Sequence, residues 1–155
     1  MNPVALIQGT VAPLPRAQVD TDQIIPKQFL KRIERTGFGE FLFHDWALDE
    51  EGEKDPSFVL NRAEYQSAKI LVAGPDFGTG SSREHAPWAI ADWGFEAVIA
   101  PSFGDIFRNN CHKIGLLAVE LPAAVVDQLL ALGAEDPTAV VSIDLATQTV
   151  TARDV

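Results

Sequence analysis

The chain has 155 residues, of which 46% are hydrophobic and 22% charged, so its size and composition fit a folded globular domain. The formal net charge of −10 makes nucleic acid and an anionic membrane surface unfavourable partners, because both attract clustered Lys and Arg. The single cysteine, Cys111, excludes an internal disulfide and fits a reducing compartment. The sequence begins with neither a basic segment nor a long apolar run, and no later run could span a membrane, so we predict a cytoplasmic protein.

The first third of the chain is the least regular part. Val4–Val11 is predicted to be a strand, and the prolines that follow at Pro13, Pro15 and Pro26 predict loops. The charged segment Leu48–Pro56 predicts a solvated surface loop.

From Lys69 onward, apolar runs alternate with helix-like segments, which is the pattern of an α/β domain. The predicted strands and helices are, in chain order, a strand over Lys69–Ala73, a helix over Ala86–Trp93, a strand over Glu96–Ala100, a helix over Phe103–Lys113, a strand over Gly115–Leu121, a helix over Pro122–Leu132 and a hairpin over Val140–Ile143 and Thr149–Thr151. Gly133 is expected just past the end of the last helix, as its C-terminal cap. We find no repeat or second domain and predict one domain over residues 1–155.

The segment Gly74–His85 combines glycines with two serines and an arginine. Glycine permits positive φ and a close approach of the backbone to a ligand. Successive backbone N–H groups before a helix form a concave donor surface that favours an anion. Arg83 adds a planar donor fork suited to a carboxylate, and Ser81 and Ser82 add hydroxyl groups. The segment therefore predicts an anion-binding loop.

An alternative interpretation of the same residues is structural. Ser81 to Glu84 matches the Ser-x-x-Glu capping box, in which the serine only starts a helix. Pro87 would then fall inside the first turns, where proline is less favoured than at the first helical position, so the helix could instead begin near Ala86. The segment is not a phosphate-binding Walker loop, a dinucleotide fingerprint or the nucleophile elbow of serine hydrolases. The residue pattern alone leaves the functional and structural interpretations open.

Three segments together resemble the swivelling domain of the aconitase superfamily. Phe77–Trp88 is similar to its long Gly-Ser-Ser-Arg motif, Val19–Pro26 to its second signature and Ile99–Leu117 to its third. With Arg35–Gly39 and Phe43–Trp46, the sequence is most similar to the family of bacterial 3-isopropylmalate dehydratase small subunits. The resemblance covers nearly the whole chain and implies an α/β fold, a single aconitase-like swivelling β/β/α domain.

The resemblance also implies roles for the glycine-rich loop. In the superfamily, a [4Fe-4S] cluster binds substrate carboxyl and hydroxyl oxygens while a serine removes a proton from carbon. By motif match, Ser81 is that base, and loop amides with Arg83 would stabilise its alkoxide. Gly80, Ser82 and Arg83 are expected to bind substrate carboxylates. His85 is expected to orient this catalytic loop rather than to transfer protons.

The second signature, Asp20-Thr21-Asp22, is expected from the resemblance to lie at the same site. Asp22 would support the catalytic groups, and Thr21 would contact substrate. On chemistry alone, an Asx-type turn between a strand and Pro26 is the favoured interpretation of these residues, and only the resemblance reverses it.

By the same resemblance, the segment Phe29–Thr36, called the recognition segment below, corresponds to the family's substrate-recognition loop. Two apolar side chains, Leu30 and Ile33, are expected to face the isopropyl group. A substrate carboxylate is expected to meet one of three basic side chains, Lys31, Arg32 or Arg35. As plain sequence, this segment is also a basic amphipathic turn on a solvated face. A further substrate-binding arginine of aconitase has no counterpart here that aligns.

The family carries its cluster cysteines on a separate large subunit, which agrees with the single cysteine of this chain. We expect no cofactor bound by this chain, a [4Fe-4S] cluster in the large subunit, and a heterodimer or higher assembly. The implied reaction is that of a lyase, interconverting 2- and 3-isopropylmalate, small dicarboxylates, through isopropylmaleate in leucine biosynthesis. Family members usually continue beyond Val155, so we expect this chain to lack their C-terminal tail.

Other functions remain open on the sequence. A related hydro-lyase small subunit, acting on citramalate or homocitrate, is one alternative, and a non-catalytic carboxylate-binding module is another. Cys111-His112 invites a metal-site or Cys-His nucleophile interpretation, but His44, His85 and His112 show no ligand spacing. We therefore predict that Cys111 is a buried small apolar residue.

Overall fold

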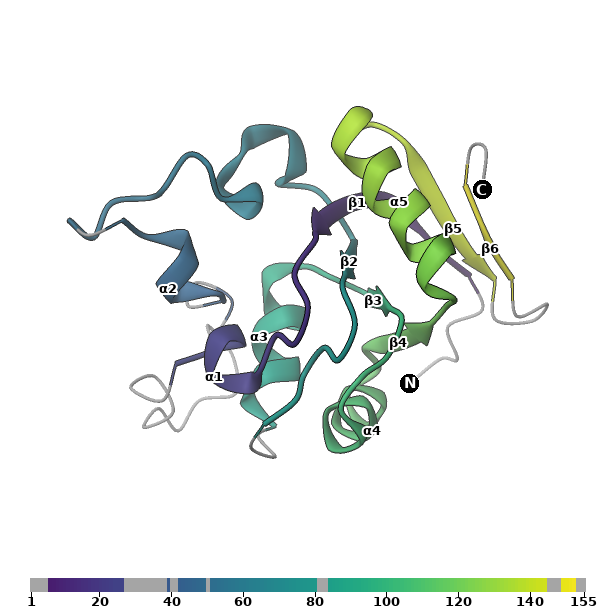
Figure 1. Cartoon of the computed structure of the whole chain (residues 1–155), viewed down its shortest axis with the longest axis horizontal. Coiled ribbons are helices and arrows are strands. Elements are labelled where there is room, and N and C mark those ends of the chain that lie inside the picture. Colours follow the sequence, from purple (N-terminus) through teal and green to yellow (C-terminus); the bar gives the residue numbers. More distant parts are fainter. Residues whose placement is uncertain are drawn as a thin grey trace.

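The computed structural model describes residues 6–26, 39, 42–49, 51–80, 84–144 and 149–152. Its centre is a six-stranded sheet with the strand order β4-β3-β2-β1-β5-β6 (Figure 1). The strands are β1 (Leu6–Leu14), β2 (Ile70–Ala73), β3 (Ala97–Ala100), β4 (Leu117–Glu120), β5 (Val140–Asp144) and β6 (Thr149–Thr151). The strands predicted from Lys69 onward are confirmed, with ends that shift by one or two residues. β1 continues three residues beyond its predicted end.

Strands β1, β2, β3 and β4 run parallel to one another, whereas β5 runs antiparallel to β1 and β6 antiparallel to β5. The register places Val11 opposite Ile70 and Ile70 opposite Ala97. The carboxyl ends of β1, β2 and β3 therefore lie at one edge of the sheet. This is the edge at which open parallel sheets bind ligands.

Helices cover both faces of the sheet. The helical segments are α1 (Thr21–Ile24), α2 (His44–Ala47), the 3-10 turns η3 (Val59–Asn61) and η4 (Ala63–Tyr65), α3 (His85–Trp93), α4 (Asp105–Lys113) and α5 (Ala123–Glu135). In Figure 1, α5 lies alongside β1 and β5, and α3 and α4 lie in the lower part of the view. The α/β fold class is confirmed. The short segments α1, α2, η3 and η4 were not predicted.

The alternation of side chains along the strands divides the core into two clusters. Leu71 and Ala73 of β2 point into the cluster that also contains Ala86 and Ile90 of α3. Ile70 and Val72 point to the opposite face, where Val126 and Leu129 of α5 pack. All four residues of β2 are buried, as expected for a strand covered on both faces.

Pro13 lies inside β1, although proline was expected to interrupt the chain here. The pairing of β1 with β5 extends only from Leu6 to Thr10, whereas β2 pairs with Val11 to Leu14. Beyond Thr10, the ladder with β5 no longer needs a donor from β1. Pro13 therefore lies where this side of β1 is unpaired, and proline is tolerated at an unpaired side of a strand.

Gly133 does not cap α5, because the helix runs through it to Glu135. A Cβ atom at this position would lie 3.2 Å from Cγ1 of Val11 and 3.5 Å from Cδ of Pro13. Gly133 therefore permits the close approach of α5 to β1, and the C-cap prediction is wrong.

Tyr65 ties the segment after η3 to the end of α5. Its hydroxyl donates a hydrogen bond of 2.9 Å to the carbonyl oxygen of Gly133, and the side chain is only 2% exposed. In a continued helix this carbonyl would accept from residue 137, but Pro137 has no N–H to donate. The tyrosine hydroxyl takes the place of that donor.

We predict that Tyr65→Phe lowers the free energy of unfolding by about 1–2 kcal/mol, because a buried carbonyl loses its donor. Urea unfolding followed by circular dichroism measures this change. Glu64→Gln, an exposed substitution next to Tyr65, is the matched control and should change stability little.

The same variant has a pH signature. Burial, followed by the charge of Glu64, raises the pKa of Tyr65 above its ordinary value of 10.0. The native state therefore holds the phenol proton more tightly than the unfolded state does. The stabilisation that protonated Tyr65 contributes is complete below about pH 10 and is lost as the pH rises through the higher native pKa. The stability difference between the wild type and Tyr65→Phe should therefore shrink at strongly alkaline pH. A constant difference would show that the hydroxyl is not the cause.

Candidate active site

The glycine-rich segment leaves the carboxyl end of β2 in close contact with the continuation of β1. The amide of Gly74 donates to the carbonyl of Arg16 at 3.0 Å. A Cβ atom on Gly74 would lie 2.6 Å from that same carbonyl oxygen. Glycine is therefore required here by a close approach of two backbones.

Backbone hydrogen bonds continue this pairing through the second signature. The amide of Gly78 donates to the carbonyl of Val19 at 2.7 Å, and the amide of Thr21 donates to the carbonyl of Thr79 at 2.9 Å. Asp20 and Thr79 also form a parallel bridge. The Asp-Thr-Asp signature therefore lies beside the glycine-rich loop, as the resemblance implies.

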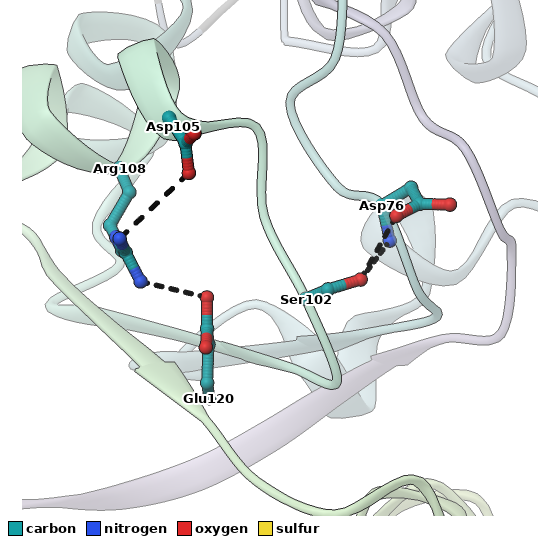
Figure 2. Close-up of polar contacts among 5 residues, drawn as sticks. All are labelled: Asp76, Ser102, Asp105, Arg108 and Glu120. Carbon is teal, nitrogen blue, oxygen red and sulfur yellow. Dashed lines mark hydrogen bonds and ion pairs between the residues drawn. The ribbon is translucent and has the colours of Figure 1, made fainter.

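The third signature is attached to the other side of the same loop. The amide of Phe77 donates to the carbonyl of Ser102 at 3.1 Å, and the amide of Gly104 donates back to the carbonyl of Phe77 at 2.9 Å. The Ser102 hydroxyl accepts a hydrogen bond from the amide of Asp76 and donates one to its carboxylate, at 2.9 and 3.0 Å (Figure 2). All three predicted motifs therefore meet at the carboxyl edge of the sheet.

Gly78 and Gly104 allow the glycine-rich loop to lie against the third signature. Gly78 has a φ of +81°, and a Cβ atom on it would lie 2.2 Å from Cγ of Phe107. A Cβ atom on Gly104 would lie 2.6 Å from the carbonyl oxygen of Gly78. The ring of Phe107 and the backbone of Gly104 occupy the space that side chains would need.

The Asp-Thr-Asp signature forms a helix start rather than an isolated Asx-type turn. Asp20 is the N-cap of α1: its carboxylate accepts from the amide of Gln23 at 2.8 Å, and the Gln23 side chain accepts from the amide of Asp20 at 3.0 Å. This reciprocal pair is a capping box, which the sequence analysis did not recognise. Thr21 is 2% exposed, and Asp22 is exposed in the first turn. Asp20 thus has a structural task, which leaves Asp22 as the acidic residue with a predicted catalytic role.

Thr21 also faces the residue before the predicted base. A Cβ atom on Gly80 would lie 3.6 Å from the hydroxyl oxygen of Thr21 and 3.4 Å from Cβ of Asp20. Gly80 has a φ of +95° and is exposed. Gly80 and Thr21, both predicted to bind substrate, are therefore neighbours.

His85 is the first residue of α3, and Glu84 is the N-cap. The His85 ring is half-buried and lies edge-on against Trp88, with ring centroids 4.7 Å apart. Pro87 occupies the third position of the helix, where its missing N–H leaves no intrahelical bond unmade. This packing fits the predicted orienting role of His85, which stays a prediction.

Several predicted site residues lie outside the described residues. They are Ser81, Ser82 and Arg83 of the glycine-rich motif and Leu30, Lys31, Arg32, Ile33 and Arg35 of the recognition segment. The positions on either side are described. Gly80 directly precedes the Ser-Ser-Arg sequence and Glu84 directly follows it. Both lie at the carboxyl edge of the sheet, where the other motifs lie.

Gly39, which ends the Arg35–Gly39 motif, is attached to α3. Its amide donates to the carboxylate of Asp92 at 2.9 Å, and a Cβ atom would lie 2.7 Å from the backbone nitrogen of Trp93. This glycine has a packing reason that the sequence analysis could not supply.

The described charged side chains near the third signature are mostly balanced by partners within the chain. Arg108 of α4 pairs with Glu120 at 2.9 Å and with Asp105 at 3.9 Å (Figure 2). Asp76, within the glycine-rich loop, and Asp105, the first residue of α4, carry exposed carboxylates. A dicarboxylate would therefore need cations from elsewhere, which is consistent with the predicted roles of Arg83 and the basic residues of the recognition segment.

A hollow of about 340 Å³ lies against the glycine-rich loop. Its lining is formed by Gly78, Thr79, Gly80, Gly104, Asp105, Ile106 and Phe107. Two larger cavities, of about 560 and 460 Å³, are lined by residues around α2 and η3 and by none of the residues 76–85. A smaller space of about 200 Å³ meets the other end of the motif, at Glu84 and Trp88.

The described part of the chain does not fit a metal or cluster site. It contains no group of three or more His, Cys, Asp or Glu residues that could hold a metal ion. Cys111 is 0% exposed, and burial raises the pKa of its thiol to about 12. The prediction that Cys111 is a buried small residue is confirmed. Within the described residues, no helix is long and apolar enough to cross a membrane.

Comparison with known proteins agrees with this geometry. Residues 1–124 match the family model of the aconitase C-terminal domain. Two curated 3-isopropylmalate dehydratase small subunits match most of the chain: that of Roseiflexus castenholzii is 56% identical over 99% of this chain and 76% of its own length, and that of Rubrobacter xylanophilus is 57% identical over 97% and 74%.

This chain belongs to the aconitase C-terminal domain family. Within that family, its curated relatives are 3-isopropylmalate dehydratase small subunits, and the chain spans about three quarters of their length. A crystal structure of 3-isopropylmalate dehydratase from Methanocaldococcus jannaschii superposes with a TM-score of 0.70 at 28% identity, over 96% of this chain and 77% of that one. The aconitase-like fold predicted from the motifs is thus confirmed.

We predict that Gly78→Ala destabilises the chain by about 1–3 kcal/mol more than Gly52→Ala does, because the new methyl group must displace Phe107. Gly52 is a matched control: it has the same φ of +81°, but a Cβ atom there would meet nothing within 4 Å. Thermal unfolding of both variants measures the difference. Equal losses would show that the clash with Phe107 does not matter.

Proposed function

We propose that this chain is the small subunit of a two-subunit hydro-lyase that interconverts 2- and 3-isopropylmalate through isopropylmaleate. The observation that carries the proposal is the meeting of the three signature loops at one edge of the sheet. Backbone hydrogen bonds join them, between Gly78 and Val19 and between Phe77 and both Ser102 and Gly104. The curated relatives, of which the chain spans about three quarters, are named for this enzyme. The enzyme name also places the reaction in leucine biosynthesis.

In this proposal Ser81 removes the proton from the substrate carbon. A serine hydroxyl is a poor base in water, so its alkoxide needs preorganised donors. The flanking geometry supports such a role: Gly80 has positive φ and lies beside the buried Thr21, and α3 begins at His85. Amides of the loop and Arg83 would stabilise the negative charge.

The substrate carboxylates are proposed to bind Ser82, Arg83 and the basic residues of the recognition segment. Arg108 is not proposed for this role, because Glu120 and Asp105 already pair with it. Leu30 and Ile33 are proposed to contact the isopropyl group and so to distinguish it from smaller substituents. Asp22 is proposed to support the catalytic groups, and His85 to orient the loop.

The partner is proposed to be the large subunit, in a heterodimer or higher assembly, and to carry a [4Fe-4S] cluster. A cluster of this kind supplies a Lewis acid for substrate oxygens when it is bound. The one cysteine of this chain is buried and cannot provide such a site. The work of this chain is therefore to position the substrate and to move the proton at Ser81.

Substrate preference tests the proposed function. Mixed anaerobically with its large subunit, the chain should dehydrate 3-isopropylmalate at least about tenfold faster, in kcat/KM, than citramalate or homocitrate, since misfit in an apolar pocket costs about that much. The formation of the unsaturated product is followed by its ultraviolet absorbance. A preference for citramalate or homocitrate would replace the proposed substrate. Tight binding of isopropylmalate by the isolated chain, without turnover in the complex, would instead favour a carboxylate-binding module.

A second prediction concerns the base. Ser81→Ala should lower kcat by about 10²–10⁴-fold, the usual worth of a positioned base, while the subunits still associate. Ser142→Ala, which removes a serine hydroxyl on β5 that accepts from Gln8, is the control and should retain normal turnover. Near-normal turnover of Ser81→Ala would remove Ser81 as the base.

A further inference from the structure

Ile106 is an exposed apolar side chain at the start of α4. It is 55% exposed, whereas the next residue, Phe107, is 3% exposed. Leu6, Ile114 and Val140 are the other large hydrophobic residues in the described part of the chain that are exposed. Isolated surface residues of this type are common and need no function. Ile106 lines the hollow beside Gly78–Gly80, whereas the less exposed Ile114, at 37%, lines a smaller space with Glu84.

The hollow has the form of a recess for a side chain. Gly78, Gly80 and Gly104 contribute backbone only to its lining, and Ile106 and Phe107 contribute apolar groups. The hollow measures about 340 Å³ and lies next to an exposed isoleucine. A recess beside an apolar residue is the shape that receives an anchor side chain from a protein partner.

The wall that carries Ile106 is held firmly. The amide of Gly104 donates a hydrogen bond to the carbonyl of Phe77. Arg108 forms ion pairs with Asp105, in the first turn of α4, and with Glu120 of β4 (Figure 2). The backbone that carries Ile106 is therefore connected to the glycine-rich loop and to β4. A surface that is already ordered loses less entropy on binding.

The charges at the rim argue against a small anion as the occupant. Asp105, whose side chain is 91% exposed, lines the recess. Arg108 is paired with two carboxylates. A dicarboxylate would meet negative charge here, whereas a protein segment with an apolar side chain flanked by Lys or Arg would be complementary.

We propose that this hollow is an anchor point for the large subunit, in which an apolar side chain of that subunit packs against Ile106 and over the backbone of Gly78 and Gly104. This step rests on the proposed function, because Ser81 can act on a substrate held by the partner only if the partner covers this edge of the sheet. Gly80, which directly precedes Ser81, lines the same hollow. The recess thus lies within the area that the partner must approach.

The test measures binding of the large subunit to matched surface variants. Ile106→Lys should weaken the Kd by at least about tenfold, as expected for a buried interface anchor. Val140→Lys is the control: Val140 is 54% exposed but lies on β5, away from the glycine-rich loop, and its variant should bind within about twofold of the wild type. Ile106→Leu keeps the apolar contact and should also bind normally. Biolayer interferometry gives the Kd, and thermal unfolding confirms that each variant is folded.

The outcomes separate this inference from the proposed function. Normal binding by a folded Ile106→Lys overturns the anchor while leaving the proposed enzyme intact, provided that the wild-type complex turns over 3-isopropylmalate. A raised KM of Ile106→Lys at saturating large subunit, with an unchanged Kd, would reassign the hollow to the substrate and also overturn the anchor. A wild-type chain that neither binds the large subunit nor supports turnover would overturn both proposals.

Discussion

Parallel pairing of β1, β2 and β3 is the constraint on which the site depends. Once these strands lie side by side, their carboxyl ends meet at one edge, and three motifs that are far apart in the sequence become neighbours. The pairing does not stop where the strands stop. Backbone hydrogen bonds continue from Gly74 and Gly78 to the segment after β1 and from Phe77 to the segment after β3. The loops therefore behave as extensions of the sheet rather than as separate surface segments.

This construction explains why glycine is needed at particular positions. Gly74 and Gly104 each approach another backbone too closely for a Cβ atom, and Gly78 faces the ring of Phe107. The glycines of Gly74–His85 were predicted to allow a ligand to approach. Gly74 and Gly78 instead serve contacts within the protein, and Gly80 is the one that lies next to Thr21 and precedes the predicted base.

The regular part of the fold could be predicted because β2 and β3 are short buried apolar runs bounded by turn residues, and β5 and β6 are short segments rich in β-branched residues. The short segments α2 and η3 could not, because tertiary contacts hold the residues that the structure describes there. Phe43 has a left-handed φ of 52° and donates its amide to Ile24, and α2 is packed through Trp46 against Phe58. Such contacts leave no periodic pattern in the sequence.

The candidate site was predicted in its motifs but not in its surroundings. Asp20 and Asp22 look alike in the sequence, and only the capping box with Gln23 separates their tasks. Ile106 and Phe107 are adjacent apolar residues of one helix, and the sequence alone does not say which of them faces the core. The burial of Phe107 beneath Gly78 decides it and leaves Ile106 at the surface.

The position of β1 in the sheet also has a consequence for folding. This strand is the first of the sheet in the chain, yet it pairs with β5, as in the contact of Leu6 with Asp144. Such long-range pairings form slowly because much of the chain must be closed into a loop first. During synthesis, β1 to β3 can emerge and bring the three signature loops together while the face that α5 will cover is still open to solvent. The site-bearing edge can thus be assembled before the domain has closed its second core.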